Sequence, residues 1–143
     1  MKRAYTEYES PRYGDVFFAD IPCGCGSAQC GKRPVVIVSN NRGNKHSPNV
    51  IALPLTSKLK KLNMPTHVII RAADEGVARD SIVLCENPIC LSKDLLEEYL
   101  TTLSPVCMQK VAVAHLYSTC SIACVPEELL TTVREFAAEM NLC

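Results

Sequence analysis

The sequence predicts an α+β protein that is mainly β, a small barrel of short strands followed by a few helices. Two observations lead to this fold class. The first half of the 143 residues contains brief Val-, Ile- and Phe-rich runs separated by turn clusters, as in small barrels. The second half changes to apolar residues at three- and four-residue steps, which indicates helices. A chain of this length fits one domain, so we expect a single unit over residues 1–143.

Five strands are predicted in the first half, each bounded by residues that favour turns. Gly and Asn tolerate positive φ, and they gather between the runs in clusters such as Pro22–Ser27 and Ser39–Pro48. The predicted strands are Asp15–Ala19, Pro34–Ser39, Asn49–Leu55, His67–Arg71 and Ser81–Cys85.

Three helices are predicted in the second half. Ser92 suits the cap of a short helix, and Ser104 with Pro105 suits the first turn of a longer one. The third follows Pro126 and has one apolar and one charged face. We expect that apolar face to pack on the barrel; contact with a second copy or a partner is the alternative. The predicted ranges are Lys93–Leu100, Pro105–Tyr117 and, as a C-terminal extension, about 126–141.

The composition indicates a cytoplasmic protein. No apolar run approaches the roughly 20 residues that a membrane-spanning helix needs, so no membrane segment is expected. The N-terminal residues include Tyr5, Glu7 and Glu9 and no apolar stretch of the secretory kind. The nine cysteines are odd in number and lack an export signal, so we expect free thiols.

Charge is segregated along a chain whose net charge is zero. From Lys32 to Arg71 there are eight basic residues and no Asp or Glu, whereas the residues from Ala72 onward include eleven acidic and four basic ones. The basic stretch can attract phosphates, although a solvated surface is the alternative.

Familiar catalytic motifs are missing. There is no P-loop, GxSxG, HExxH or GxGxxG motif. The basic stretch has no carboxylate to hold Mg²⁺, so a hydrolase built on it would work without metal, and no cofactor is expected.

Several passages occur in the order and spacing of one known family. They are Gly14-Asp-Val-Phe-Phe-Ala-Asp, Gly26-Ser-Ala-Gln-Cys-Gly-Lys-Arg-Pro-Val-Val-Ile-Val-Ser-Asn-Asn, Gly43-Asn-Lys-His-Ser-Pro, Pro54-Leu-Thr-Ser-Lys, Leu62-Asn-Met-Pro-Thr-His-Val, Asp80-Ser-Ile-Val-Leu-Cys-Glu and Thr102-Leu-Ser-Pro. Over about residues 13–120 the chain thus resembles the MazF/PemK family of toxins.

The resemblance implies an SH3-like barrel of the CcdB/MazF type, assembled as a homodimer that binds RNA at its interface. It implies a toxin endoribonuclease that cleaves single-stranded mRNA sequence-specifically without metal. The 2′-hydroxyl of the RNA attacks the adjacent phosphate and leaves a 2′,3′-cyclic phosphate and a 5′-hydroxyl. The implied partner is a MazE-like antitoxin, and contact with promoter DNA is expected only through the toxin–antitoxin complex.

Two positions match the catalytic residues of the family, Arg33 and Thr56. A guanidinium keeps its proton at neutral pH, so Arg33 suits charge stabilisation of the phosphorane or donation to the leaving oxygen. The hydroxyl of Thr56 can hydrogen-bond a phosphate oxygen. Without the resemblance, Thr56 would be interpreted as a strand-end hydroxyl bonded to the backbone.

Six further residues are predicted to contact RNA. Small residues between Pro22 and Gly31 predict a flap that moves. Two positions depart from the family pattern: Ala28 stands where Glu is usual, and Ile89 where an RNA-binding Arg is usual, which leaves open how RNA is recognised there. The predicted contacts are Ser27, Gln29, Lys32, His46, Ser57 and Lys58.

For the two remaining histidines a structural role is expected, and for the flap cysteines several roles are open. We expect His67, in a predicted strand, to be hydrogen-bonded rather than catalytic, and His115, on a predicted helix, to have a packing role. Cys23, Cys25 and Cys30 form a cluster. Zinc binding, a Cys23–Cys25 or Cys25–Cys30 disulfide, and merely tolerated thiols all stay open for it.

Two other functions compete with RNA cleavage. Proteins of the CcdB family have the same barrel and poison DNA gyrase without enzymatic activity, but such an inhibitor needs neither Arg33 nor Thr56. A catalytically degenerate barrel that only binds RNA is kept open by Ala28 and Ile89.

Overall fold

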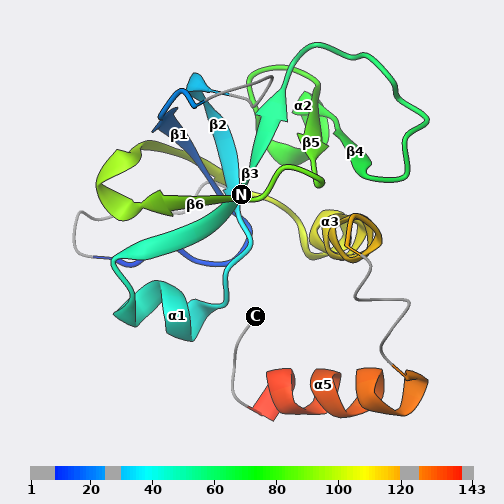
Figure 1. The fold of residues 1–143 in the computed structure, drawn as a ribbon. Coiled ribbons are helices and arrows are strands. Elements are labelled where there is room, and N and C mark those ends of the chain that lie inside the picture. The colour runs from blue at the N-terminus through cyan, green and yellow to red at the C-terminus, as the bar shows by residue number, and fades with distance from the viewer. Residues whose placement is uncertain (1–8, 25–29, 120–125, 140–143) are drawn as a thin grey trace.

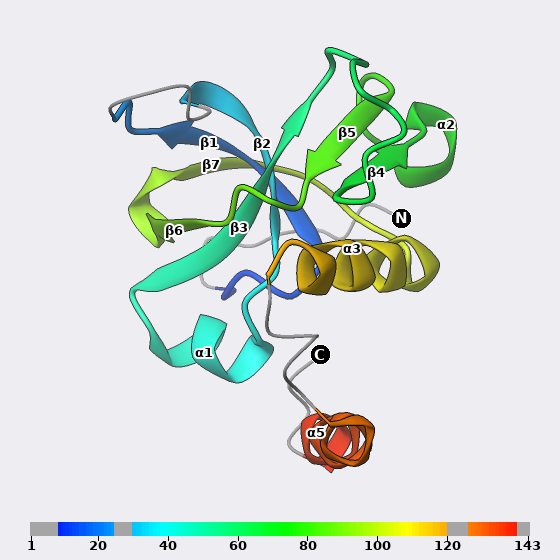
Figure 2. The same cartoon turned by 45° about the vertical axis from the view of Figure 1, so that its right-hand side comes forward.

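Seven strands form one curved antiparallel sheet (Figures 1 and 2). The computed structural model of the protein describes residues 9–24, 30–119 and 126–139. The strands within these ranges are β1 (Asp15–Ile21), β2 (Gly31–Ile37), β3 (Asn49–Thr56), β4 (His67–Ile70), β5 (Ser81–Leu84), β6 (Ile89–Ser92) and β7 (Leu96–Thr102). Their order in the sheet is β4-β5-β3-β2-β1-β7, and β6 pairs with the first half of β3.

Helices lie around the sheet and at the C-terminal end of the described chain. None of the helices in the described ranges has the length and apolar character that crossing a bilayer requires. They are α1 (Asn41–His46), α2 (Ala72–Glu75), the 3₁₀ turn η1 (Lys93–Leu95), α3 (Pro105–Tyr117) and α5 (Glu127–Glu139).

Both faces of the sheet are buried, each under its own hydrophobic core. Neighbouring residues of a strand point to opposite sides of the sheet, so each strand contributes to both cores. Val35 belongs to a core with Phe17 and Leu91, enclosed by β1, β2, β3 and β6. Val36, the next residue, belongs to a second core, which also contains Val111 of α3. The sheet is therefore an apolar layer between two cores, and α3 closes the second of them.

The start of α3 is capped as the sequence predicts. Ser104 accepts a hydrogen bond from the Cys107 backbone N–H at 3.2 Å, and Pro105 occupies the first turn. The Glu75 carboxylate accepts hydrogen bonds from the backbone N–H and the hydroxyl of Ser104, both at 2.7 Å. These bonds satisfy donors that a helix start leaves unpaired, and they join α2 to α3.

The helix predicted over Lys93–Leu100 is wrong. Ser92 does accept a hydrogen bond from Asp94, but the chain makes only the turn η1 and then becomes β7 beside β1. In this strand Tyr99 contacts Phe17, with ring centroids 5.7 Å apart. Tertiary pairing along the open edge of β1 therefore overrides the local helical pattern.

The C-terminal helix α5 is confirmed, but its expected packing on the barrel is wrong. In both ribbon views α5 lies apart from the sheet, and Leu129 is 52% exposed. The reason is that α3 already covers the face of the sheet on which a second helix could have packed. Contact of α5 with a second copy or a partner stays a prediction.

Candidate active site

Arg33 and Thr56 lie where β2 and β3 part. The two strands pair with Val35 opposite Pro54. Continuing this antiparallel register by two residues places Arg33 opposite Thr56, with both side chains on the same face. Here β2 stays beside β1 while β3 turns to pair with β5 (Figure 2). The two predicted catalytic residues, 23 positions apart in sequence, thus lie two residues beyond the last pair of β2 and β3, one on each strand.

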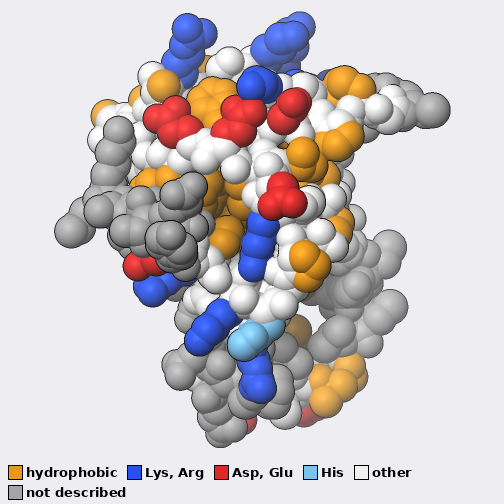
Figure 3. Space-filling model, turned by 90° about the vertical axis from the view of Figure 1, so that its left-hand side faces the viewer, with side chains coloured by type: hydrophobic (Ala, Val, Ile, Leu, Met, Phe, Trp, Pro, Cys, Tyr) orange, Lys and Arg blue, Asp and Glu red, His pale blue; other side chains and the backbone are white. Residues whose placement is uncertain are grey.

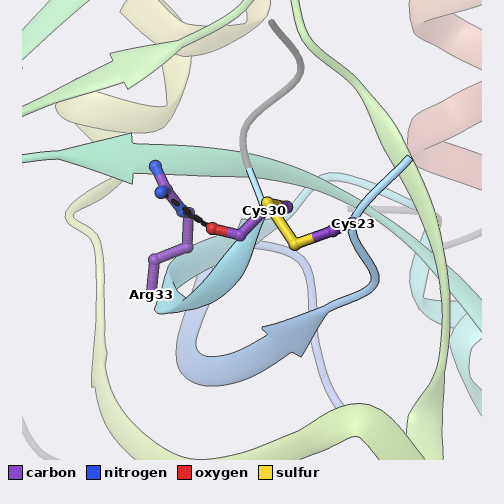
Figure 4. Close-up of a disulfide and its surroundings, with 3 residues drawn as sticks. All are labelled: Cys23, Cys30 and Arg33. Carbon is purple, nitrogen blue, oxygen red and sulfur yellow. Dashed lines mark hydrogen bonds between the residues drawn. A yellow bond between two sulfur atoms is a disulfide. The ribbon is translucent and has the colours of Figure 1, made fainter. Parts of the chain in front are cut away.

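The Arg33 side chain is held by its own loop. Its Nε and Nη2 atoms donate to the Cys30 carbonyl oxygen at 3.3 and 2.9 Å (Figure 4). Arg33 is half-buried at the start of β2. Because two donors of the guanidinium share one backbone acceptor, the direction of the charged group depends on the position of Cys30.

A disulfide joins Cys30 to Cys23 (Figure 4). The expectation of free thiols is therefore wrong for these two residues, and the pairing differs from both disulfides considered from the sequence. The physical reason is the hairpin: Ile21 and Gly31 form the last pair of β1 and β2, so the residues just beyond them meet with a Cα–Cα distance of 4.9 Å. A disulfide also removes the thiolates that zinc would need.

The Thr56 hydroxyl has one backbone partner. Its oxygen accepts a hydrogen bond from the Lys58 N–H at 3.2 Å, which is the contact expected of a strand-end hydroxyl. The hydroxyl hydrogen has no acceptor among the described residues, so it can be donated to a ligand. Ser57 and Lys58 are exposed beside it.

The neighbouring residue Lys32 points to the other face of the strand. Its Nζ lies 2.9 Å from the Glu97 carboxylate, and this hydrogen bond raises the pKa of Lys32. The structure thus separates Lys32 from Arg33 and gives it an acidic partner, which RNA would have to displace.

His46 lies at the other end of the molecule from Arg33. It ends α1, and the eight-residue strand β3, about 25 Å long, runs from the α1 side to Thr56. In Figure 3, Lys and Arg side chains lie at the lower end of the face, the end at which Figure 1 places α1. The structure therefore does not bring His46 close to Arg33 and Thr56.

Three flap positions singled out from the sequence, Ser27, Ala28 and Gln29, lie outside the described residues. Ile89, where the family usually has an RNA-binding Arg, pairs with Ala52 and packs against the core around Phe17. Ile89 therefore has a core role, which explains the apolar residue at this position.

His67 and Glu86 form a contact that sequence reasoning missed. The His67 Nε2 lies 2.9 Å from the Glu86 carboxylate, and Nδ1 lies 3.0 Å from the Lys61 carbonyl oxygen. The expectation of a hydrogen-bonded His67 is correct, but no sequence pattern indicated its partners. Only the β4–β5 pairing, with His67 opposite Leu84, brings them together.

The chain is similar to known proteins. Residues 12–115 match the profile of the PemK-like, MazF-like toxin of type II toxin–antitoxin system. A curated relative, Endoribonuclease MazF of Staphylococcus saprophyticus subsp. saprophyticus, is 44% identical over 100 residues, which cover 70% of this chain and 83% of the relative.

Two solved structures share the fold. One is a mycobacterial endoribonuclease in complex with its cognate antitoxin, 30% identical, with a TM-score of 0.58 and coverage of 76% of this chain and 92% of that chain. The other is MazF from Deinococcus radiodurans, 20% identical, with a TM-score of 0.67 and coverage of 82% and 99%; it supports the fold alone. The predicted α+β, mainly β fold class is thereby confirmed. The prediction of a MazF-type toxin endoribonuclease is confirmed as well, and this chain belongs to the PemK-like, MazF-like toxin family of type II toxin–antitoxin systems.

Proposed function

We propose that this toxin cleaves single-stranded RNA at specific sequences without metal, with Arg33 and Thr56 as its catalytic residues. The observation that supports the proposal is the register of β2 and β3, which pairs Val35 with Pro54 two residues before Arg33 and Thr56 on their strands. The stretch from Lys32 to Arg71, which supplies both residues, contains no carboxylate that could hold a divalent cation.

In the proposed reaction the substrate supplies its own nucleophile. The 2′-oxygen bonds to the adjacent phosphorus and its proton passes to solvent water, while the bond from phosphorus to the 5′-oxygen breaks and that oxygen takes up a proton from water. Arg33 keeps its proton; it stabilises the charge of the phosphorane and donates a hydrogen bond to the leaving oxygen. Thr56 donates its hydroxyl hydrogen to a phosphate oxygen, while the Lys58 N–H occupies the oxygen of that hydroxyl.

RNA binding extends from this point along exposed residues. Ser57 and Lys58 contact the phosphate beside Thr56, since cations and hydroxyls position nucleic-acid backbones. Ser27 and Gln29 contact bases from the flap. Lys32 and His46 contribute only to more distant parts of a longer RNA, Lys32 after release from Glu97. The proposed RNA contacts are therefore Ser27, Gln29, Lys32, His46, Ser57 and Lys58.

The proposed partner is a MazE-like antitoxin with a flexible, acidic segment. The positive charge of the basic stretch attracts an acidic antitoxin segment as it attracts RNA, so the two compete for the same surface. Excess antitoxin therefore keeps the toxin bound and inactive by mass action. The related mycobacterial structure is named as a complex with a cognate antitoxin, which supports this partner. The toxin itself acts as a homodimer, and promoter DNA is contacted only through the toxin–antitoxin complex.

The test is incubation of purified protein with a long single-stranded RNA in EDTA, with mapping of the fragment ends. We expect cleavage that leaves 2′,3′-cyclic phosphate and 5′-hydroxyl ends. Arg33→Ala and Thr56→Val should each lose on the order of 10²-fold in rate, the cost of removing one donor to a developing charge. The matched controls are Arg33→Lys, which keeps the positive charge but not the planar set of guanidinium N–H donors, and Thr56→Ser, which keeps the hydroxyl.

Other outcomes lead to other functions. Absence of cleavage by folded protein that still binds RNA would indicate a degenerate, RNA-binding barrel. Absence of both, with inhibition of DNA gyrase, would indicate a CcdB-like inhibitor. Cleavage that survives Arg33→Ala would remove Arg33 from the mechanism.

A further inference from the structure

The segment between Thr56 and His67 is the most basic surface loop next to the candidate site. Lys58, Lys60 and Lys61 are exposed in it, and it contains no acidic residue. At its start the Lys58 N–H donates to Thr56, and the Lys60 N–H donates to the Lys58 carbonyl oxygen at 2.8 Å. The conformation of this basic loop is thus coupled to the Thr56 hydroxyl.

Lys61 has a backbone conformation that must be held. Its φ is +53°, and among the described residues it is the one non-glycine residue with positive φ. Side chains other than glycine adopt this region at a cost in free energy, so such residues persist where the surrounding contacts fix them. The turn is closed at 3.2 Å by a hydrogen bond from the Met64 N–H to the Lys61 carbonyl oxygen.

His67 is the second group that holds this carbonyl. Its side chain is 8% exposed, and its Nδ1 lies 3.0 Å from the Lys61 oxygen. A carbonyl oxygen only accepts, so Nδ1 must carry a hydrogen. The other ring nitrogen faces the Glu86 carboxylate at 2.9 Å, which fixes the plane of the ring. One buried ring thus connects the end of β5 to the strained turn of the basic loop.

The strands place this anchor close to the candidate site. In β5, Ile82 pairs with Thr56 and Leu84 pairs with His67. Two residues of an extended strand span roughly 7 Å. The loop therefore leaves the sheet at Thr56 and returns to it at His67, on the other side of β5, so holding its far end limits where its lysines lie.

We propose that His67, oriented by Glu86, is a positioning residue for RNA binding: it fixes the turn at Lys61 so that the basic loop meets the phosphates next to Thr56. This inference rests on the proposed function. His67 itself touches neither the RNA nor the reacting atoms. Its loss should therefore weaken RNA binding and leave the chemical step intact.

Two substitutions of the same residue separate its two contacts. The Asn side chain can place its amide nitrogen near the position of Nδ1, whereas Gln can place its amide nitrogen near that of Nε2. His67→Gln should raise the Kd and KM for RNA about tenfold with kcat within about twofold, as expected for the loss of a hydrogen bond to a positioned group. His67→Asn should recover most of the affinity.

Binding is measured on a single-stranded RNA whose 2′-hydroxyls are replaced by 2′-fluorine, which lacks the proposed nucleophile. Failure of the cleavage mechanism is thereby separated from failure of this inference. The salt dependence of binding should become shallower in His67→Gln, by about 0.7 per lost phosphate contact. Arg134→Gln, which removes an exposed cation of α5 outside the basic stretch Lys32–Arg71, should leave Kd and slope unchanged.

A mutant cycle, in which the three lysines of the loop are changed together as one partner and His67 is the other, tests whether His67 acts through the lysines. In a protein with Lys58, Lys60 and Lys61 all changed to Gln, the further change His67→Gln should have no effect on Kd, because contacts that act as one unit are not additive. An unchanged Kd in the single His67→Gln protein, a full additional loss in the triple background, or a fall in kcat with unchanged KM would overturn the proposal. If His67→Gln does not fold, Glu86→Gln replaces it, with an expected rise in Kd of about threefold.

Discussion

At the scale of single residues, the free thiols differ sharply in environment. Among the described cysteines outside the disulfide, Cys90 is exposed while Cys85 and Cys107 are buried. Burial disfavours the thiolate and raises the pKa of Cys85 from 9.0 to about 12 and that of Cys107 to about 11. The neutral thiol is thus the stable form in the folded protein, so these two groups lower the free energy of unfolding as pH rises above about 9.

Alkylation of the native protein should follow this order. Because the thiolate is the reactive species, iodoacetamide at pH 8 should modify Cys90 rapidly and leave Cys85 and Cys107 unmodified until the chain is unfolded. Mass mapping of peptides over time measures the three rates, and Cys90→Ser identifies the fast signal. Labelling of Cys85 as fast as Cys90 would contradict the burial of its thiol.

At the scale of elements, the β1–β2 hairpin connects the disulfide to the candidate catalytic residue. Cys23 and Cys30 close a ring beyond the last strand pair, and the Cys30 carbonyl oxygen accepts two donors of Arg33. The ring contains two of the predicted RNA contacts, Ser27 and Gln29. The hairpin therefore couples the redox state of one pair of thiols to the direction of the Arg33 side chain.

Removing the disulfide should weaken this element. The double change Cys23→Ser with Cys30→Ser should lower the free energy of unfolding by about 2 to 3 kcal/mol, the loop-closure entropy of a ring of this size. Chemical denaturation in oxidised and reduced buffer measures it; the control Cys90→Ser, which keeps the disulfide, should unfold with the free energy of the wild type in each buffer. RNA cleavage should fall in parallel, because Arg33 loses its fixed acceptor. Equal stability of the variant and the oxidised wild type would show that the disulfide contributes nothing.

At the scale of the whole molecule, α3 has an outward face with apolar residues. Val106, Val113 and Tyr117 recur at seven- and four-residue steps and are 64, 60 and 64% exposed. Residues at this spacing share one face of a helix. Such a stripe favours burial against another molecule, which fits the predicted homodimer.

The assembly prediction is tested by sedimentation. Wild-type protein should sediment as a dimer, and Val113→Glu should shift it toward monomer, because the change places a charge in the apolar contact. Ile51→Glu, a change at an exposed apolar residue of β3, is the matched control and should leave the dimer intact. A wild-type monomer at micromolar concentration would contradict the homodimer.

The sequence by itself determined the elements whose signal is local. Alternation and turn clusters located β1 to β5, and the pair Ser104–Pro105 located the start of α3. Sequence motifs in the order and spacing of the family, including those with Arg33 and Thr56, identified the family. These features could be predicted because strand alternation, helix capping and motif spacing depend on residues that are near one another in the chain.

The tertiary structure alone decided which distant residues meet. Residues 96–100 became part of β7 instead of a helix because the edge of β1 was there to pair with, and Cys23 met Cys30 because the hairpin ends beside them. Lys32 and His46 were separated from the site by strand alternation and by the length of β3. The contact of His67 with Glu86 arose in the same way, from β4–β5 pairing. Each of these outcomes depends on contacts between segments far apart in sequence, which local patterns do not encode.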